Sequence, residues 1–124
     1  MEQSEGYAIF DFNLDPSKRS KWSTGSFLEP NSPFFSKHVE IGISQRNSQS
    51  RPDSQHFHRE TKEFYLVISG QLVLQINNKT IILKPLEMVV VLPNSIHAVI
   101  KAVDDTKFIV IKSPSGLNDK VIVP

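Results

Sequence analysis

Short apolar runs alternate with turn-forming residues along most of this chain. The runs are rich in Val, Ile, Phe and Tyr, which favour extended strands, and Gly, Pro, Asn and Ser stand between them. Neither a helical period longer than one turn nor an internal repeat interrupts the pattern. The runs predict strands at residues 7–12, 25–29, 37–43, 64–69, 71–76, 79–84, 87–93, 97–103 and 107–114, with a short one near the C-terminus. This spacing is typical of an all-β sandwich or barrel.

The length and the net charge of the chain limit the number of domains and the classes of partner that we expect. A chain of 124 residues can bury one core but not two independent ones. Its 14 basic and 13 acidic side chains nearly balance, so we expect neither nucleic acid nor an anionic membrane as a partner. No apolar run approaches the ~20 residues of a membrane helix. The N-terminus, MEQSEGY, lacks the basic start and apolar centre of a signal peptide, so we expect a cytoplasmic protein.

The segment HFHRETKEFYLVISG carries the candidate chemistry. His56 and His58 lie two residues apart, so in a strand they share one face and can converge on one metal ion. Glu63 lies an odd number of residues from His58, and an unbroken strand would send it to the opposite face. The chain must therefore turn within residues 59–62. Gly70 can adopt the positive φ of the tight turn that follows.

A histidine pair alone is a weak signal, because two exposed polar residues on a strand give the same pattern. A third histidine, His97, follows the apolar run VVVLP and a Pro-Asn turn, which returns it to a sheet edge. The fourth, His38, has Glu40 as its one ligand-like neighbour, and we expect a surface or packing role for it.

In these segments the chain resembles the cupins, which are small double-stranded β-helix barrels. The first cupin motif reads Gly, five residues, His-x-His, three or four residues, Glu, six residues, Gly. His56, His58, Glu63 and Gly70 stand at the expected intervals. The second motif has a Pro-x-Gly turn shortly before a histidine, which LPNSIH matches up to His97. The resemblance implies an all-β cupin barrel of jelly-roll type.

The sequence departs from the cupin pattern at three positions. Ser50 stands where the opening glycine is expected, and Lys101 stands where an asparagine is common. Asn94 replaces the turn glycine, which is the mildest change because Asn tolerates left-handed backbone conformations.

The resemblance implies a metal site made of His56, His58, Glu63 and His97. Three imidazoles and a carboxylate suit a divalent transition metal, Fe, Mn, Ni, Co or Zn, and do not suit Ca or Mg. The chain has no cysteine, so thiolate ligands are excluded. On an octahedral ion four protein ligands leave two open positions, although a tetrahedral ion would be saturated by them. Glu60 is a rival carboxylate, but we expect it in the turn.

Side chains near this site have alternative interpretations. Alternation places Tyr65 on the same face as Glu63, as a candidate catalytic residue that contacts substrate or as a packed core residue. Lys101 would contact an anionic substrate or extend to the rim. A polar stretch, residues 44–55, is predicted as a loop near the barrel mouth, and three arginines, Arg46, Arg51 and Arg59, flank this mouth. They would attract a carboxylate or phosphate, or are simply solvated.

The resemblance covers residues 37–114, and the remaining segments need a role of their own. Residues 1–36 carry apolar strand patterns, so they are predicted to extend the barrel or to form the interface of a homodimer, since exposed strand edges are usually covered. Residues 115–124 are predicted as a turn and a short strand.

Two classes of function remain open. The first is a metal-dependent enzyme acting on a small organic molecule, dioxygenase-like by preference, with the isomerases, decarboxylases and lyases of the cupins as alternatives. The second is a non-catalytic module that binds a small molecule. No Ser-His-Asp or Cys-His arrangement competes with the metal site, because cysteine is absent and the candidate histidines are assigned to the metal. A shared fold does not choose between the two classes.

Overall fold

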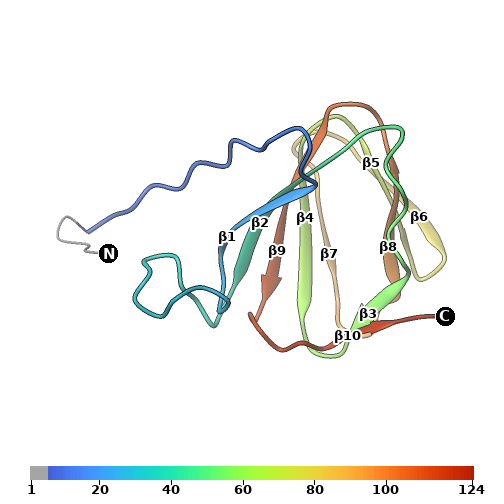
Figure 1. Cartoon of the computed structure of the whole chain (residues 1–124). Helices are drawn as coiled ribbons and strands as arrows, with labels where there is room; N and C mark the ends of the chain where they lie inside the picture. The colour runs from blue at the N-terminus through green and yellow to red at the C-terminus, as the bar shows by residue number, and fades with distance from the viewer. Residues whose placement is uncertain (1–5) are drawn as a thin grey trace.

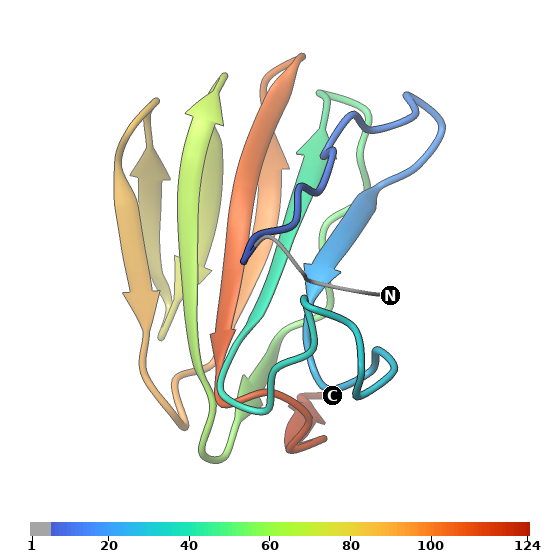
Figure 2. The same cartoon turned by 90° about the vertical axis from the view of Figure 1, so that its left-hand side faces the viewer.

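Two antiparallel sheets face each other in a computed structural model that describes residues 6–124 (Figures 1 and 2). The first five residues, part of the predicted segment 1–36 and of the stretch without signal-peptide character, lie outside it. The strands are β1 (Ser20–Thr24), β2 (Glu40–Arg46), β3 (His56–His58), β4 (Lys62–Ser69), β5 (Leu72–Ile76), β6 (Lys79–Leu83), β7 (Met88–Val91), β8 (His97–Ala102), β9 (Thr106–Ser113) and β10 (Lys120–Ile122). One sheet has the order β1-β2-β9-β4-β7 and the other β10-β3-β8-β5-β6. The predicted all-β jelly-roll fold is confirmed, and residues 6–124 contain no helix that could span a membrane.

The inner faces of the sheets divide into an apolar part and a polar part. Val67, Leu72, Leu74 and Phe108 are almost completely buried and form the centre of the apolar core. Alternation along β4 then turns Glu63 inward on the same face as Val67. The barrel is therefore filled with apolar side chains toward one end and presents polar side chains toward the other.

Residues with positive φ make the tight connections. Asn77 and Asn78 have φ values of 48° and 68° and form a two-residue turn between β5 and β6. Asn94, the residue in place of the cupin turn glycine, has φ 67°, the left-handed conformation that Asn tolerates. Gly70 has φ 80°, and a Cβ atom there would lie 2.6 Å from the Cα atom of Thr106. Glycine is thus required at this turn for both conformation and space.

Two predicted N-terminal strands are wrong. Residues 7–12 pair with no strand, and only Phe10 and Phe12 pack locally, with the ring of Phe10 5.0 Å from that of Phe12 and 5.6 Å from that of Phe34. Residues 25–29 form a turn closed by a hydrogen bond from Leu28 N–H to the Gly25 carbonyl. The strand of this region is instead β1, whose sequence SKWST is mostly polar and so hides the strand pattern.

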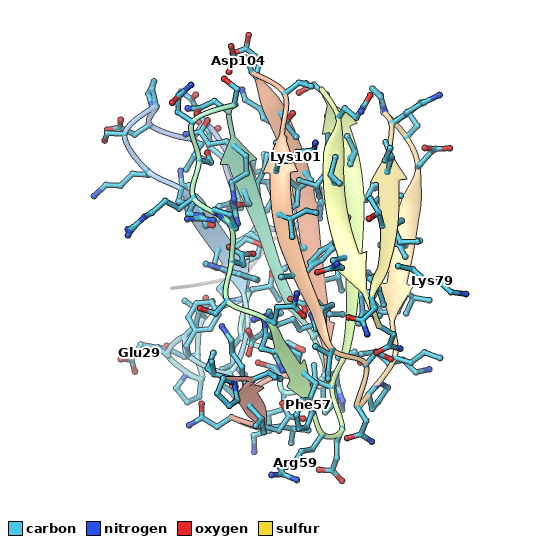
Figure 3. The ribbon with its side chains drawn as sticks, turned by 90° about the vertical axis from the view of Figure 1, so that its right-hand side faces the viewer. Glu29, Phe57, Arg59, Lys79, Lys101 and Asp104 are labelled. Atoms are coloured by element: carbon cyan, nitrogen blue, oxygen red, sulfur yellow. The ribbon has the colours of Figure 1, made fainter. Side chains whose placement is uncertain are left out.

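The predicted loop 44–55 and the alternation along β8 also need correction. β2 continues to Arg46, so the first residues of that stretch belong to a strand. In β8, Lys101 pairs with Val73 while Val99 pairs with Leu74, which leaves Ile100 as an extra, bulged residue. The bulge reverses the alternation, so Lys101 is exposed on the outer surface (Figure 3) and Ala102 is buried.

The predicted homodimer stays a prediction, with a direct test. Tyr7 and Ile9 are 64% and 85% exposed in a segment that runs outward from the sheets (Figure 1). Apolar side chains presented in this way favour a second copy of the chain as their cover. We expect sedimentation velocity to show a species of twice the chain mass. Serine at both positions should shift it to the monomer, and a strict monomer of the unaltered chain would contradict the dimer.

Candidate metal centre

The structure brings the four predicted metal ligands together. His56 and His58 come from β3, His97 from β8, and Glu63 from β4 in the facing sheet. One ligand atom from each residue lies within 4.8 Å of the corresponding atoms of the other three. All four side chains are buried, with His97 only 1% exposed. These four residues are called the histidine–glutamate cluster below.

A turn between β3 and β4 solves the phase problem of Glu63, as predicted. β3 ends at His58 and β4 begins at Lys62, so the chain changes direction in between. The carboxylate of Asp119 holds this turn, because it accepts hydrogen bonds from the N–H groups of Glu60, at 2.7 Å, and Thr61, at 2.9 Å. The Thr61 hydroxyl donates a further bond to it at 2.9 Å. Asp119 immediately precedes β10, which pairs with β3.

Hydrogen bonds fix the orientation of all three imidazoles. The Nδ1 atoms of His56 and His97 each lie 2.9 Å from the carbonyl oxygen two residues earlier, Ser54 and Ser95. The Nδ1 atom of His58 lies 3.3 Å from a carboxylate oxygen of Asp119. Because carbonyl and carboxylate oxygens only accept, each Nδ1 must carry the proton. The Nε2 lone pair of each ring then remains for a metal, in the arrangement typical of metal-binding histidines.

The centre of the cluster requires a cation. The Oε1 atom of Glu63 lies 2.7 Å from Nε2 of His97 and 3.5 Å from Nε2 of His58. Since each of these nitrogens faces the carboxylate with a lone pair, the contact needs a second proton on the imidazole or a metal ion bound by both the imidazoles and the carboxylate. His58 Nε2 is buried and has no hydrogen-bond partner among residues 6–124. The donor atoms therefore fit a divalent transition metal.

The pKa shifts agree with a cluster that favours positive charge at its centre. Burial alone would raise the pKa of Glu63, but its interactions with His58 and His97 outweigh burial and hold the pKa well below the ordinary value. The interaction with Glu63 raises the pKa of His58. Burial lowers the pKa of His56, which favours the neutral, metal-binding imidazole.

A cavity of about 250 Å³ extends from the cluster toward β1 and β2. Tyr65 lines it and is buried, with its ring centroid 6.3 Å from that of His97. Burial, followed by the negative charge of Glu63, raises the pKa of Tyr65, so its hydroxyl stays protonated at neutral pH. The geometry allows this hydroxyl to meet a ligand, and its catalytic role stays a prediction.

Several side chains considered from the sequence lie away from the cluster. His38, Glu60, Arg51 and Arg59 are all exposed. Arg59 lies at the turn between β3 and β4 (Figure 3), where its guanidinium is 5.9 Å from the ring of Phe57. Of the three arginines at the predicted mouth, Arg46 is the one that lines the cavity.

Two residues near the site were not predicted from the sequence. Asp119 lies in the tail, 61 residues from His58, and nothing in the sequence indicates that the two meet. Lys112 lines the cavity and stands opposite Glu63 in the β4–β9 ladder. Alternation from Phe108 through Val110 would have placed Lys112 on the inner face.

Comparisons with known proteins agree on the fold. A protein with a double-stranded β-helix domain from Klebsiella pneumoniae is 16% identical over 95% of this chain and 98% of that chain, with a TM-score of 0.68. KdgF from Halomonas is 13% identical over 80% of each chain, with a TM-score of 0.65. A variant of Streptomyces Pac13 solved with uridine is 14% identical over 94% of this chain and 92% of that chain, with a TM-score of 0.63. At these identities the likeness concerns the fold alone.

The sequence itself decides the family. No curated protein matches it. Residues 47–112, more than half of the chain, match the family model described as the cupin domain. This match includes all four residues of the histidine–glutamate cluster, and the protein therefore belongs to the cupin family.

Proposed function

We propose that this protein is a metal-dependent enzyme that acts on a small organic molecule in the cavity beside the histidine–glutamate cluster. One observation carries the proposal. Three imidazoles are each fixed through Nδ1 by an acceptor, and those of His58 and His97 direct Nε2 toward the buried carboxylate of Glu63. Hydrogen bonds of this kind orient a metal-binding histidine and increase its basicity.

The donor set supports a divalent ion of Fe, Mn, Ni, Co or Zn. When bound, such an ion polarises a coordinated substrate oxygen and, in the case of iron, activates dioxygen. Structural zinc sites are usually closed by their four ligands, whereas this cluster borders a cavity of about 250 Å³. The protonated hydroxyl of Tyr65 can donate a hydrogen bond to a ligand in that cavity. These features favour a catalytic site over a purely structural one.

Within this class we expect a dioxygenase-like reaction first, because an ion held by the three histidines and Glu63 beside the cavity could take up both a substrate oxygen and dioxygen. The alternative is an elimination or isomerisation without oxygen. The similarity to Pac13, described as a nucleoside dehydratase, and the neutral hydroxyl of Tyr65, which can donate a hydrogen bond to a leaving group in the cavity, support it. A binding module without turnover is the remaining candidate.

Metal content and oxygen uptake separate these candidates. The full chain is purified without a histidine tag, loaded anaerobically with each of the five metals, and analysed for bound metal. We expect about one ion per chain. Oxygen consumption is then followed over catechols, diketones and thiols. Turnover without oxygen uptake would identify the alternative, and bound metal without turnover on any substrate would favour the binding module.

The two glutamates give a matched test of the carboxylate ligand. Glu63→Gln should weaken metal binding by at least about tenfold, because the anionic ligand becomes a neutral amide. Glu60→Gln should leave metal binding unchanged, because Glu60 is exposed on the turn. Metal affinity measured by competition with a chromogenic chelator compares the two variants. Equal affinities would contradict the assignment of Glu63.

A further inference from the structure

A buried arginine at the far side of the cavity is not explained by the metal site. Arg46 is the last residue of β2, and its side chain is only 8% exposed. Its Nη2 atom lies 3.5 Å from a carboxylate oxygen of Asp53, but Arg19 approaches the same oxygen more closely, at 2.7 Å. The Arg46 Nε atom is buried and has no hydrogen-bond partner in the described part of the chain. A buried polar donor of this kind is costly unless a partner satisfies it.

The surroundings of Arg46 hold the guanidinium toward the cavity. Its central carbon lies over the ring of Phe108, 5.2 Å from the centroid, which is a cation–π contact. The Ser44 hydroxyl and the Gln45 carbonyl accept hydrogen bonds from Nη1. These contacts fix the side chain in the wall of the cavity.

The charges lining the cavity favour an anion. Arg46, Lys112 and Lys120 contribute positive charge to its wall, and Asp53 and Glu63 contribute negative charge. The Asp53 carboxylate is engaged by Arg19, and that of Glu63 by His97. The Lys112 ammonium lies 5.2 Å from the ring centroid of Trp22. An incoming anion therefore meets cations whose charge the protein does not fully neutralise.

We propose that Arg46 binds a carboxylate or phosphate group of the substrate, so that the substrate is a small anion reaching from Arg46 to the histidine–glutamate cluster. This inference rests on the proposed function, since it assigns a substrate class to the same cavity. A guanidinium presents paired N–H donors that match the oxygens of either group. Because the cluster and Arg46 line one cavity, a single ligand can contact both.

A second hollow offers a competing place for an anion. It measures about 320 Å³ and is lined by Lys18, Arg19 and Lys107, and also by Arg46. Trp22, the single tryptophan of the chain, lines the cavity of the cluster but not this hollow. Trp22 fluorescence therefore distinguishes binding in the cavity from binding in this hollow.

The test titrates the full chain with inorganic phosphate and with succinate at constant ionic strength, and with neutral succinamide as control. Chelator-treated and Zn²⁺-loaded protein are both measured. Readouts are Trp22 fluorescence and the Nε–H NMR signal of Arg46, assigned by its loss in Arg46→Gln. We expect both signals to change saturably with at least one anion, and neither to respond to succinamide. The stronger of the two anions identifies the group that Arg46 prefers.

Variants complete the design. Arg46→Gln should weaken anion binding at least tenfold, and Arg46→Lys should retain part of it. The exposed Arg51→Gln should bind like the unaltered chain. Anion binding that leaves Trp22 fluorescence unchanged, or that depends on Lys107 instead of Arg46, would overturn the proposal. Metal content of Arg46→Gln is measured in parallel: metal binding without anion binding defeats this inference alone, and anion binding without metal binding defeats the proposed function alone.

Discussion

Replacing His97 with alanine is expected to reduce metal affinity on the order of a hundredfold or more. Outer-shell residues of metal sites already contribute about 10–100-fold to affinity, and His97 is itself a proposed ligand. Its Nε2 atom makes the closest contact to Glu63, at 2.7 Å, so the variant loses one ligand and leaves a second without its partner. Elemental analysis after loading and competition with a chelator measure the effect.

The fourth histidine provides the control for this substitution. His38 is exposed and lies outside the histidine–glutamate cluster, so His38→Ala should keep full metal content. His56→Ala should behave like His97→Ala, which guards against a folding defect peculiar to one position. Circular dichroism checks that each variant retains its sheets. If the two cluster variants keep the metal of the unaltered chain, the assignment of the site is wrong.

Replacing Asp119 with alanine is expected to weaken both the fold and the metal site. The variant leaves the N–H groups of Glu60 and Thr61 without their acceptor, and such losses cost roughly 1–3 kcal/mol each when buried. Because water reaches part of this turn, we expect the free energy of unfolding to fall by about 2 kcal/mol. Loss of the acceptor at Nδ1 of His58 should also lower metal affinity by about tenfold or more.

Asp104→Ala is the matched control for Asp119→Ala. Asp104 also accepts a backbone N–H, that of Ser48, but it lies at the end of the barrel opposite Arg59 (Figure 3). The Asp104→Ala variant should have the metal affinity of the unaltered chain. A loss of stability in Asp119→Ala with unaltered metal affinity would show that Asp119 only braces the turn and does not position His58.

The contribution of Asp119 to stability should also depend on pH. Burial would raise its pKa, but the hydrogen bonds from Glu60 and Thr61 outweigh burial and lower the pKa from 3.8 to about 2. A carboxyl group with a lowered pKa in the folded state stabilises that state when ionised. The difference in urea midpoint between the unaltered chain and Asp119→Ala should thus be full above about pH 4 and shrink as the pH falls toward 2. A constant difference across this range would contradict the interpretation.

The sequence predicts the barrel and the cluster because both depend on local rules. The apolar runs from residue 64 onward lie on strands of the structure, since their alternation matches one buried face. The odd spacing of His58 and Glu63 requires a turn, and the structure has one. The left-handed tolerance of Asn also explains why Asn94 replaces a glycine without loss of the turn.

The remaining features depend on contacts that the sequence pattern does not carry. β1 is a strand because it pairs with β2, although its own residues are mostly polar. The bulge at Ile100 comes from the register between β5 and β8, so alternation alone misplaces Lys101. Asp119 reaches the β3–β4 turn from the tail of the chain, and only the pairing of β10 with β3 brings it there.

The three imidazoles differ in how their orientation is secured. His56 and His97 each donate a hydrogen bond to a carbonyl two residues earlier in the same segment. Their orientation therefore depends only on local backbone structure. His58 instead depends on Asp119, which belongs to a tail attached by the short strand β10. Metal binding and docking of the tail are therefore thermodynamically linked. The factor by which a docked tail raises the affinity for metal must equal the factor by which bound metal raises the equilibrium constant for docking of the tail.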